Sequence, residues 1–484
     1  MRYVVVGAGT AGCIVAARLS EDPANEVVLL EGGPDRRVEN REDGIRALNW
    51  ISALDESQAF WPDIQATRQV GDPRRQYMRG RGVGGSGAVN AMICLPGLPS
   101  DYDRWARELG CDGWAWSDVE PWFEAMRVAL TPCPTEWYTP MDRALETAGS
   151  ALGLPTGADT YTPEPGVGSV YLSASTTMRQ SSAEAWLDPA RRRPNLAVRT
   201  DSWVDEILWD GDHAVGIQLV GGEQISADHV VLSGGTFEST AILLRSGVDN
   251  PALGRNLRDH SAASIRVLLK DEYKRNDMSV PCINVVLRTS SSVAQDDIHL
   301  LPMHGSMDGG ETDALVMAAA MTVRSEGTVA LDPSNPTAHP VIDLHMLTGP
   351  GDRQVMREAV RLMVDVLEGP GFAEIIDRIV VDEQGTPVDA LRDDAILDDW
   401  IQRKLGDYFH ACGTCRMGRP DDPAAVVDLD GALLGRSGVH VIDASVMPDV
   451  PAANTHWPTA MVAERLTARL MERDLADLTF PDVS

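Results

Sequence analysis

A glycine-rich turn near the amino terminus has the residue types and spacing of a dinucleotide-binding site. Gly7, Gly9 and Gly12 form a Gly-x-Gly-x-x-Gly motif in which Thr10 and Ala11 separate the last two glycines. The first glycine permits a tight turn, the second lets the backbone approach a pyrophosphate, and the third allows a helix to pack closely on a strand. The amino end of that helix then faces the negatively charged phosphates.

An acidic residue follows this motif at the distance expected for ribose recognition. Glu31 closes the next apolar run, about 20 residues beyond the glycines, where a carboxylate can accept hydrogen bonds from both ribose hydroxyls. A carboxylate at this position disfavours NADP, because it would repel the 2'-phosphate. It does not distinguish NAD from FAD.

These residues require a strand–turn–helix–strand unit to position them. Apolar runs at residues 3–6 and 27–30 flank an alanine-rich helical pattern, and strand–glycine–helix patterns return at residues 228–247 and from residue 438. This alternation is typical of a parallel α/β sheet. Elsewhere, the pair Gly221-Gly222 predicts a hairpin, and residues 352–367 predict a strong helix.

Composition and charge disfavour several classes of protein. The formal net charge is −30, which argues against nucleic-acid binding and against an anionic membrane surface, since both need basic partners. No apolar run approaches the roughly 20 residues that span a bilayer, and the amino terminus has no secretory leader. Seven scattered cysteines fit a reducing compartment. We therefore predict a cytoplasmic protein without a membrane span, and leave its oligomeric state open.

A second glycine-rich region carries a family resemblance. Residues 79–92 resemble the first signature of the GMC (glucose–methanol–choline) oxidoreductases, and residues 97–105 continue the likeness. Further blocks in family order are residues 195–216, 233–247, 253–260, 410–418, 441–448 and 454–459. The resemblance implies an α/β fold in which a Rossmann-like FAD-binding domain, assembled from both ends of the chain, joins a β-sheet substrate-binding domain.

The resemblance also implies a division of the chain. Residues 1–260 form the first part of the FAD-binding domain, with a cofactor-covering excursion at about residues 32–79. Residues 261–409 form the substrate-binding domain, and residues 410–484 return to the FAD-binding domain with the catalytic pair.

FAD is the cofactor that the resemblance implies, and the family pattern assigns residues to it. Val89 stands where covalent members carry the flavin-linked histidine, so we expect non-covalent FAD. Thr459 lies at a helix amino terminus, where backbone N–H groups can stabilise the anionic reduced flavin. Besides the glycine motif and Glu31, the implied cofactor-binding residues are Val83, Gly84, Gly85, Ser86, Asn90, Ala91, Met92, Val204, Ser233, Gly234, Asp443, Ala444 and Thr459.

Three features depart from the family pattern. Gly87 replaces the usual second serine of the first signature, and Thr240 replaces the usual proline of the second. The segment between Gly247 and Gly254 is shorter than usual. These departures leave the implied FAD residues in place and concern the loops around the substrate entrance.

Two histidines align with the catalytic positions of the family. Oxidation of an alcohol by a flavin requires loss of the hydroxyl proton and hydride transfer from the carbinol carbon to flavin N5. A neutral imidazole can take the proton while a second group holds the alkoxide oxygen. By resemblance, His410 is the main base and His456 its partner, and the reverse assignment stays open.

The remaining histidines are expected to have lesser roles. We expect His260 to be structural, whereas His299, His304 and His345 are weaker candidates for lining the substrate cavity. Trp61 is expected to pack on the cofactor.

The pair Cys412 and Cys415 has the spacing of a redox or metal motif, but it lies inside a GMC block and no second cysteine pair accompanies it. We therefore expect neither redox nor metal chemistry there. Trp457, beside His456, is expected to shape the pocket.

The sequence thus predicts an FAD-dependent enzyme that oxidises a primary or secondary alcohol, with O2 or an electron carrier as acceptor. Alternatives within the same fold are an FAD-containing hydroxynitrile lyase, a mycofactocin-associated dehydrogenase and a non-catalytic flavin-binding protein. An NAD-dependent dehydrogenase is a more distant alternative. Some blocks are similar to those of bacterial aryl-alcohol and hydroxymethylfurfural oxidases, and choline is a less favoured substrate because no aromatic cage is evident.

Overall fold

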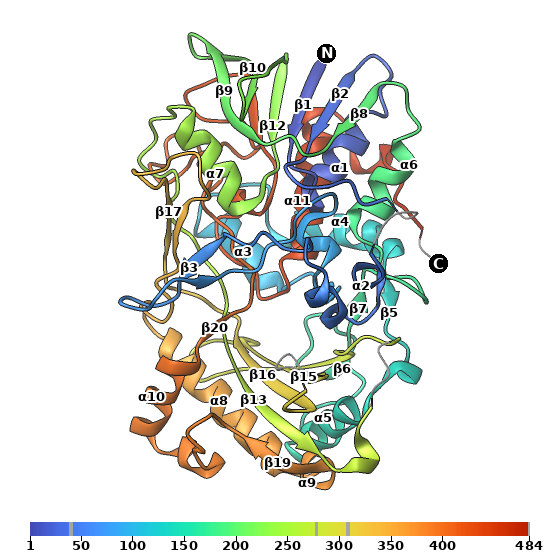
Figure 1. The fold of residues 1–484 in the computed structure, drawn as a ribbon, viewed down its shortest axis with the longest axis vertical. Helices are drawn as coiled ribbons and strands as arrows, with labels where there is room; N and C mark the ends of the chain where they lie inside the picture. The colour runs from blue at the N-terminus through green and yellow to red at the C-terminus, as the bar shows by residue number, and fades with distance from the viewer. Residues whose placement is uncertain (38–41, 276–278, 306–309, 483–484) are drawn as a thin grey trace.

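The chain folds into two halves stacked along the long axis of the molecule (Figure 1). The computed structural model describes residues 1–37, 42–275, 279–305 and 310–482. Residues 38–41 of the predicted excursion lie outside this description. Within the described ranges, no helix is both long and apolar enough to cross a bilayer.

The apolar runs around the nucleotide motif form a five-stranded parallel sheet in the first half. In spatial order its strands are β21 (Val439–Val441), β12 (His229–Leu232), β1 (Arg2–Val6), β2 (Glu26–Leu30) and β8 (Leu196–Arg199). In β1 and β2 nearly every residue is buried, as expected for a parallel sheet covered on both faces. The strands predicted at residues 3–6, 27–30 and 228–232 and after residue 438 are confirmed.

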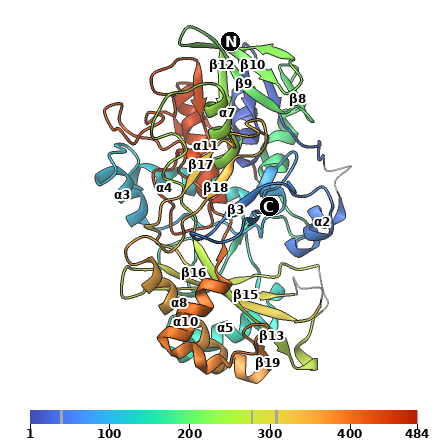
Figure 2. The same cartoon turned by 60° about the vertical axis from the view of Figure 1, so that its left-hand side comes forward.

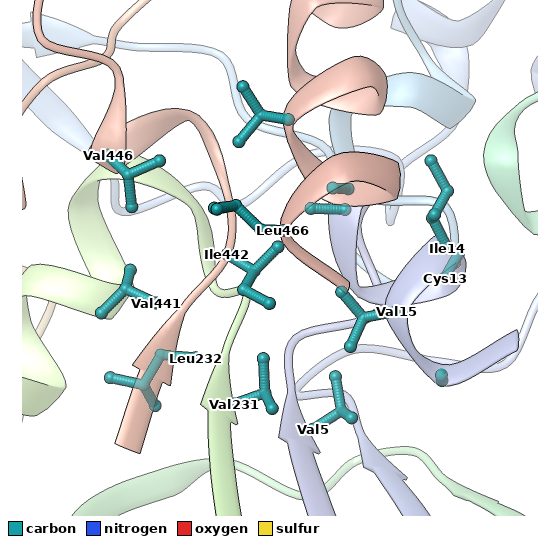
Figure 3. Packing of buried hydrophobic residues seen from close by; sticks show 14 of the residues in the cluster. Val5, Cys13, Ile14, Val15, Val231, Leu232, Val441, Ile442, Val446 and Leu466 are labelled. Carbon is teal, nitrogen blue, oxygen red and sulfur yellow. The ribbon is translucent and has the colours of Figure 1, made fainter. Parts of the chain in front are cut away.

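Both ends of the chain share the core of this half. Helix α1 (Thr10–Leu19) packs against α11 (His456–Leu470), which contains the last long apolar segment. Leu466 of α11 is fully buried and lies beside Ile442 and near Val15 of α1 (Figure 3). The blue start and the red end of the chain accordingly lie together in the upper half of Figure 1.

Further elements complete the first half. The predicted glycine hairpin is confirmed, because antiparallel strands flank Gly221 and Gly222, both with positive φ. These further elements are α3 (Pro99–Arg107), α4 (Trp116–Met126), β5 (Thr131–Pro132), β7 (Tyr171–Leu172), α6 (Asp188–Ala190), β9 (Val204–Asp210), β10 (His213–Leu219), β11 (Gln224–Ser226) and α7 (Gly235–Arg245).

The second half is built on a mainly antiparallel sheet. Its strands, in spatial order, are β19 (Ile376–Val380), β13 (Ser261–Leu269), β16 (Ala314–Ala320), β15 (Ile298–His304), β14 (Val285–Thr289) and β6 (Gly166–Ser169), with β20 (Gly406–Asp407) also paired to β13. Helix α8 (Asp352–Glu368) packs against β13, β15 and β16, which confirms the helix predicted at residues 352–367. Around it lie α5 (Pro140–Ala151), α9 (Phe372–Ile375) and α10 (Asp394–Lys404). Strand β6 and helix α5 belong to the second half, although they come from the segment before residue 260. The division of the chain expected from the sequence placed that whole segment in the FAD-binding domain.

The predicted excursion at about residues 32–79 bridges the two halves. It contains α2 (Asp43–Arg46), the 3-10 helix η1 (Trp50–Asp55), β3 (Gln65–Thr67) and β4 (Arg75–Gln76). Strand β3 pairs in parallel with β18 (Val341–Asp343), which pairs with β17 (Thr328–Ala330). Figure 2 shows these strands together at mid-height, so backbone hydrogen bonds join the excursion to residues 341–343.

Candidate active site

A cavity of about 500 Å³ receives walls from both halves of the molecule. Gly7 and Glu31 line one end, at the carboxyl ends of β1 and β2, where open parallel sheets bind their ligands. His410 and Met317 line the other end, beside the second sheet. A ligand that fills the cavity therefore reaches from the nucleotide motif to the predicted base.

Most of the predicted site residues lie along this cavity, and three do not. Gly12, Val83 and Gly84 lie behind its wall, where the Gly84 N–H donates to the Ala8 carbonyl at 2.7 Å. The predicted residues that line it are Gly7, Gly9, Thr10, Ala11, Glu31, Gly85, Ser86, Asn90, Ala91, Met92, Val204, Ser233, Gly234, His410, Asp443, Ala444, His456 and Thr459.

The geometry of the glycine turn fits a dinucleotide. Gly7 has a φ of +95°, and a Cβ on Gly12 would lie 1.8 Å from the Gly7 carbonyl oxygen, so α1 starts directly against the turn. A Cβ on Gly9 would meet no atom within 4 Å, because the backbone there faces the cavity. The first N–H groups of α1 have no partners within the helix and are available to a pyrophosphate.

Glu31 is held at the end of β2 by two backbone groups. Its Oε2 accepts a hydrogen bond from the Ala8 N–H at 2.9 Å, and its Oε1 accepts one from the Gly33 N–H at 2.8 Å. A carboxylate oxygen has capacity for a further donor, so these bonds orient Glu31 and still allow it to accept a ribose hydroxyl. The turn and the acid together fit the ADP part of FAD.

Asp443 and Asn90 shape the wall through contacts within the protein. The Asp443 carboxylate accepts from the Gly235 N–H at 2.8 Å, the Ser239 hydroxyl at 2.6 Å and the Ser445 N–H at 2.8 Å. The side-chain oxygen Oδ1 of Asn90 accepts a hydrogen bond from the Met92 N–H at 2.9 Å, and Met92 has a positive φ of 63°. Both side chains thus fix the backbone that faces the cavity.

His410 lies at the meeting point of the two halves. Its Nδ1 is 2.9 Å from Nδ1 of His260, and its Nε2 is 3.4 Å from Nδ2 of Asn454. Asn454 lines the cavity, whereas His260 is fully buried behind it. Nε2 is therefore the nitrogen of His410 on the cavity side.

His456 begins α11 and faces the start of α1. Its Nδ1 lies 3.1 Å from the hydroxyl oxygen of Thr10. A Cβ on Gly87 would lie 2.8 Å from that same oxygen and 3.1 Å from Cε1 of His456. The glycine at position 87, where the family pattern has serine, leaves space for this histidine.

Comparisons with known proteins agree with this geometry. Family models described as GMC oxidoreductase match residues 1–262 and residues 323–463. The chain belongs to the GMC oxidoreductase family. Like its relatives, it is an FAD-dependent oxidoreductase that acts on CH–OH donors.

The similarity to other GMC oxidoreductases spans whole chains. The chain is 32% identical to 5-(hydroxymethyl)furfural oxidase of Methylovorus sp. (strain MP688), covering 97% of this chain and 98% of that protein. It is 30% identical to an oxygen-dependent choline dehydrogenase of Klebsiella pneumoniae (strain 342), covering 97% and 96%. The crystal structure of pyridoxine 4-oxidase from Mesorbium loti superposes with a TM-score of 0.86 at 27% identity, covering 98% of this chain and 99% of that chain.

Several residues of this GMC oxidoreductase's cavity were not predicted from the sequence. Arg79, Tyr408 and Asn454 surround His410, and apolar side chains of β15 and β16 form the wall beside it. Arg79 and Asn454 lie inside the family blocks, so their position in those blocks was the available signal. The strand residues carry no such signal, because alternating apolar residues are typical of any half-buried strand.

The three histidines that were weaker candidates for lining the cavity do not line it. None of His299, His304 and His345 is among the residues that line it. His299 and His304 are buried within the second sheet, and Nε2 of His345 lies 3.0 Å from a carboxylate oxygen of Asp343. The family block singled out His410, whereas no sequence pattern fixed whether His299 and His304 point into the cavity, because the inward or outward direction of a strand residue depends on its partners.

Two further expectations concern buried residues near the catalytic blocks. Trp457 was expected to shape the pocket, but its indole points away and donates to the Tyr161 hydroxyl at 3.0 Å. Cys412 and Cys415 are both buried, and burial raises the pKa of the Cys415 thiol to about 12. A thiol in this state is a poor nucleophile and a poor metal ligand.

The surroundings of His410 predict activity at mildly acidic pH. Burial lowers the pKa of His410 well below 6.5, and the nearby His260, Arg79 and His299 lower it further. A base acts when it is unprotonated, so a lowered pKa extends the active range to lower pH. We expect kcat/KM for an alcohol, measured against pH, to stay on its plateau as the pH falls through 6.5. An acid limb centred at or above that pH would contradict this assignment of the base.

Proposed function

We propose that this enzyme oxidises a neutral, largely apolar alcohol to the carbonyl compound, with His410 removing the hydroxyl proton. The observation that carries the proposal is the placement of the His410 Nε2 on the cavity side, next to Asn454. Burial keeps the imidazole neutral by lowering its pKa, so the nitrogen can accept a proton. Removal of that proton prepares the carbinol carbon to release a hydride.

Bound along the glycine turn, FAD would supply the acceptor for that hydride at flavin N5. The residues that would hold it are those of the turn, Glu31 and the first turn of α11, where Thr459 lines the cavity. Val89 has no nucleophilic atom, which supports non-covalent binding. His456 serves as the second polar group and holds the alkoxide oxygen.

The wall beside His410 favours an apolar substrate. Leu301 faces Met317, and Met303 faces Leu315, in the register of β15 and β16. All four line the cavity, as does the indole of Trp50. Residues two apart in a strand point to the same face, so these side chains form one continuous apolar surface.

Charge at the reactive end disfavours a cationic substrate. In the described part of the cavity wall, the charged side chains near His410 are those of Arg79 and Asp407. The Asp407 carboxylate forms an ion pair with the buried Arg68. No free carboxylate in this part of the described wall is left to balance a quaternary ammonium group. A cation would therefore meet the guanidinium of Arg79 without compensation.

A matched pair of substrates tests this preference. Choline and 3,3-dimethylbutan-1-ol have the same shape and differ in charge. We expect kcat/KM for the neutral alcohol to exceed that for choline by about 100-fold, which corresponds to about 2.7 kcal/mol. Equal values, or a preference for choline, would show that the apolar wall does not select the substrate.

The reaction itself is tested with an alcohol deuterated at the carbinol carbon. The proposal expects the carbonyl product and a slower flavin reduction with the deuterated substrate, because the C–H bond breaks in that step. Reoxidation by O2 or only by an added electron carrier then separates oxidase from dehydrogenase. Release of cyanide from a hydroxynitrile without any change in the flavin spectrum would instead establish a lyase.

A further inference from the structure

Two consecutive residues, Asp259 and His260, hold His410 from behind the cavity. The segment before β13 runs antiparallel to the segment that contains His410, since Arg258 pairs with Cys412 and Ser261 pairs with Asp407. Between these pairs, two residues on one side oppose residues 408–411 on the other. The longer side must therefore bulge, and Phe409 in the bulge has a φ of +63°.

Hydrogen bonds fix both the backbone and the ring of His410 in this bulge. The Asp259 carboxylate accepts from the His410 N–H at 2.8 Å and from the Tyr77 hydroxyl at 2.7 Å. The His260 ring meets the His410 ring edge-on, with an interplanar angle of 86° and an Nδ1–Nδ1 distance of 2.9 Å. At this distance one nitrogen must carry the proton and the other the lone pair.

The surroundings of the two rings decide which nitrogen carries the proton. His260 is fully buried, and burial lowers its pKa to about 3, so the ring is neutral and has a single N–H. Nδ2 of Asn454 lies 3.4 Å from Nε2 of His410, and an amide nitrogen only donates, so Nε2 of His410 carries the lone pair and its Nδ1 carries the proton. Nδ1 of His260, 2.9 Å away, is therefore the acceptor for that proton, and the single N–H of His260 is on its Nε2.

We propose that His260 is a positioning residue that holds His410 in the tautomer with its proton on Nδ1 and its lone pair on Nε2, facing the substrate. This inference rests on the proposed function. When the substrate O–H bond breaks, the proton forms a bond to Nε2 of His410, and His260 keeps its own proton. The resulting imidazolium then donates from Nδ1 to the lone pair of His260.

This arrangement performs the orienting task of the carboxylate in a Ser-His-Asp triad without its charge. A carboxylate in contact with an imidazole raises the pKa of the imidazole, whereas a neutral ring does not. His260 can therefore fix the tautomer of His410 and still leave it unprotonated in mild acid.

Three variants at position 260 separate the hydrogen bond from packing. His260→Leu removes the acceptor, and we expect the rate constant of anaerobic flavin reduction to fall by about 100-fold or more. His260→Asn retains an acceptor and is expected to stay within about tenfold of the wild type. His260→Asp adds a negative charge and is expected to move the acid limb of kcat/KM upward by about one pH unit or more.

Another buried histidine provides the matched control. His304→Gln replaces a ring that is also buried but, in the described structure, bonds to the Arg275 N–H and is not among the groups that lower the pKa of His410, so we expect little change in rate or pH profile. Wild-type rates and pH profiles in both His260→Leu and His260→Asp would overturn the proposal. If His260→Leu does not fold, the pH profile of His260→Asp decides.

A direct readout does not depend on turnover. In the ¹⁵N-histidine NMR spectrum of the holoenzyme, the signals of His410 are identified by their loss in His410→Gln. The proposal expects Nδ1 protonated and Nε2 unprotonated, and the reverse would overturn it. If instead no alcohol reduces the wild-type flavin, the proposed function fails while the tautomer measurement stands.

Discussion

Replacing His410 with alanine is expected to lower the rate constant of flavin reduction by an alcohol about 1,000-fold, within the range that general bases contribute. The imidazole supplies the cavity-side nitrogen that accepts the hydroxyl proton, and alanine leaves no group in its place. The Asp259 carboxylate should still hold the backbone at position 410, because that bond uses the main-chain N–H. Stopped-flow reduction under anaerobic conditions measures the effect.

The control for this variant is His345→Ala. His345 lies outside the cavity wall, and its replacement should leave the rate constant of flavin reduction unchanged. The visible spectrum and the dissociation constant of FAD should match the wild type in both variants. A His410→Ala enzyme that reduces its flavin within about tenfold of the wild-type rate constant would remove His410 from the role of base.

The glycine turn gives the second large effect, through two alanine substitutions with opposite outcomes. At Gly9 the backbone has a φ of −76°, which alanine adopts, and the added Cβ would enter the cavity. We expect Gly9→Ala to leave the stability of the apoprotein within about 0.5 kcal/mol and to weaken FAD binding by about 100-fold. Thermal unfolding of the apoprotein and fluorescence titration with FAD measure the two quantities.

At Gly12 the added Cβ would lie 1.8 Å from the carbonyl oxygen of Gly7, a backbone atom that cannot move alone. We therefore expect Gly12→Ala to destabilise the apoprotein by more than about 4 kcal/mol or to prevent folding. Each variant serves as the control for the other. A Gly9→Ala protein with wild-type FAD affinity would show that the cofactor does not approach this backbone.

The nucleotide half of the fold could be predicted because its signals are local. Gly7, Gly9 and Gly12 have roles fixed by turn geometry, and the strands on either side are short apolar runs bounded by glycine. The hairpin at Gly221-Gly222 follows from the same kind of signal, since two residues with positive φ join two alternating strands. The structure confirms each of these elements.

The substrate half could not be predicted to the same depth, because its pairings are long-range. Strand β6 joins the second sheet from a segment more than 90 residues before β13, and no local pattern encodes that partner. His260 illustrates the same limit in the site. We expected it to be structural, yet it contacts a ring 150 residues away in the sequence. The available signal was the adjacent Asp259, because two polar residues directly precede the largely buried strand β13.

The central claim is that this chain removes a proton and a hydride from an alcohol at the cavity between its two halves. The most direct test is an anaerobic titration of the purified holoenzyme with 3,3-dimethylbutan-1-ol and a benzylic alcohol, followed through the visible absorbance of oxidised flavin. The account predicts stoichiometric bleaching in the wild type and bleaching slowed about 1,000-fold in His410→Ala. A wild-type flavin that dithionite bleaches, but that neither these nor other neutral alcohols bleach, would contradict it.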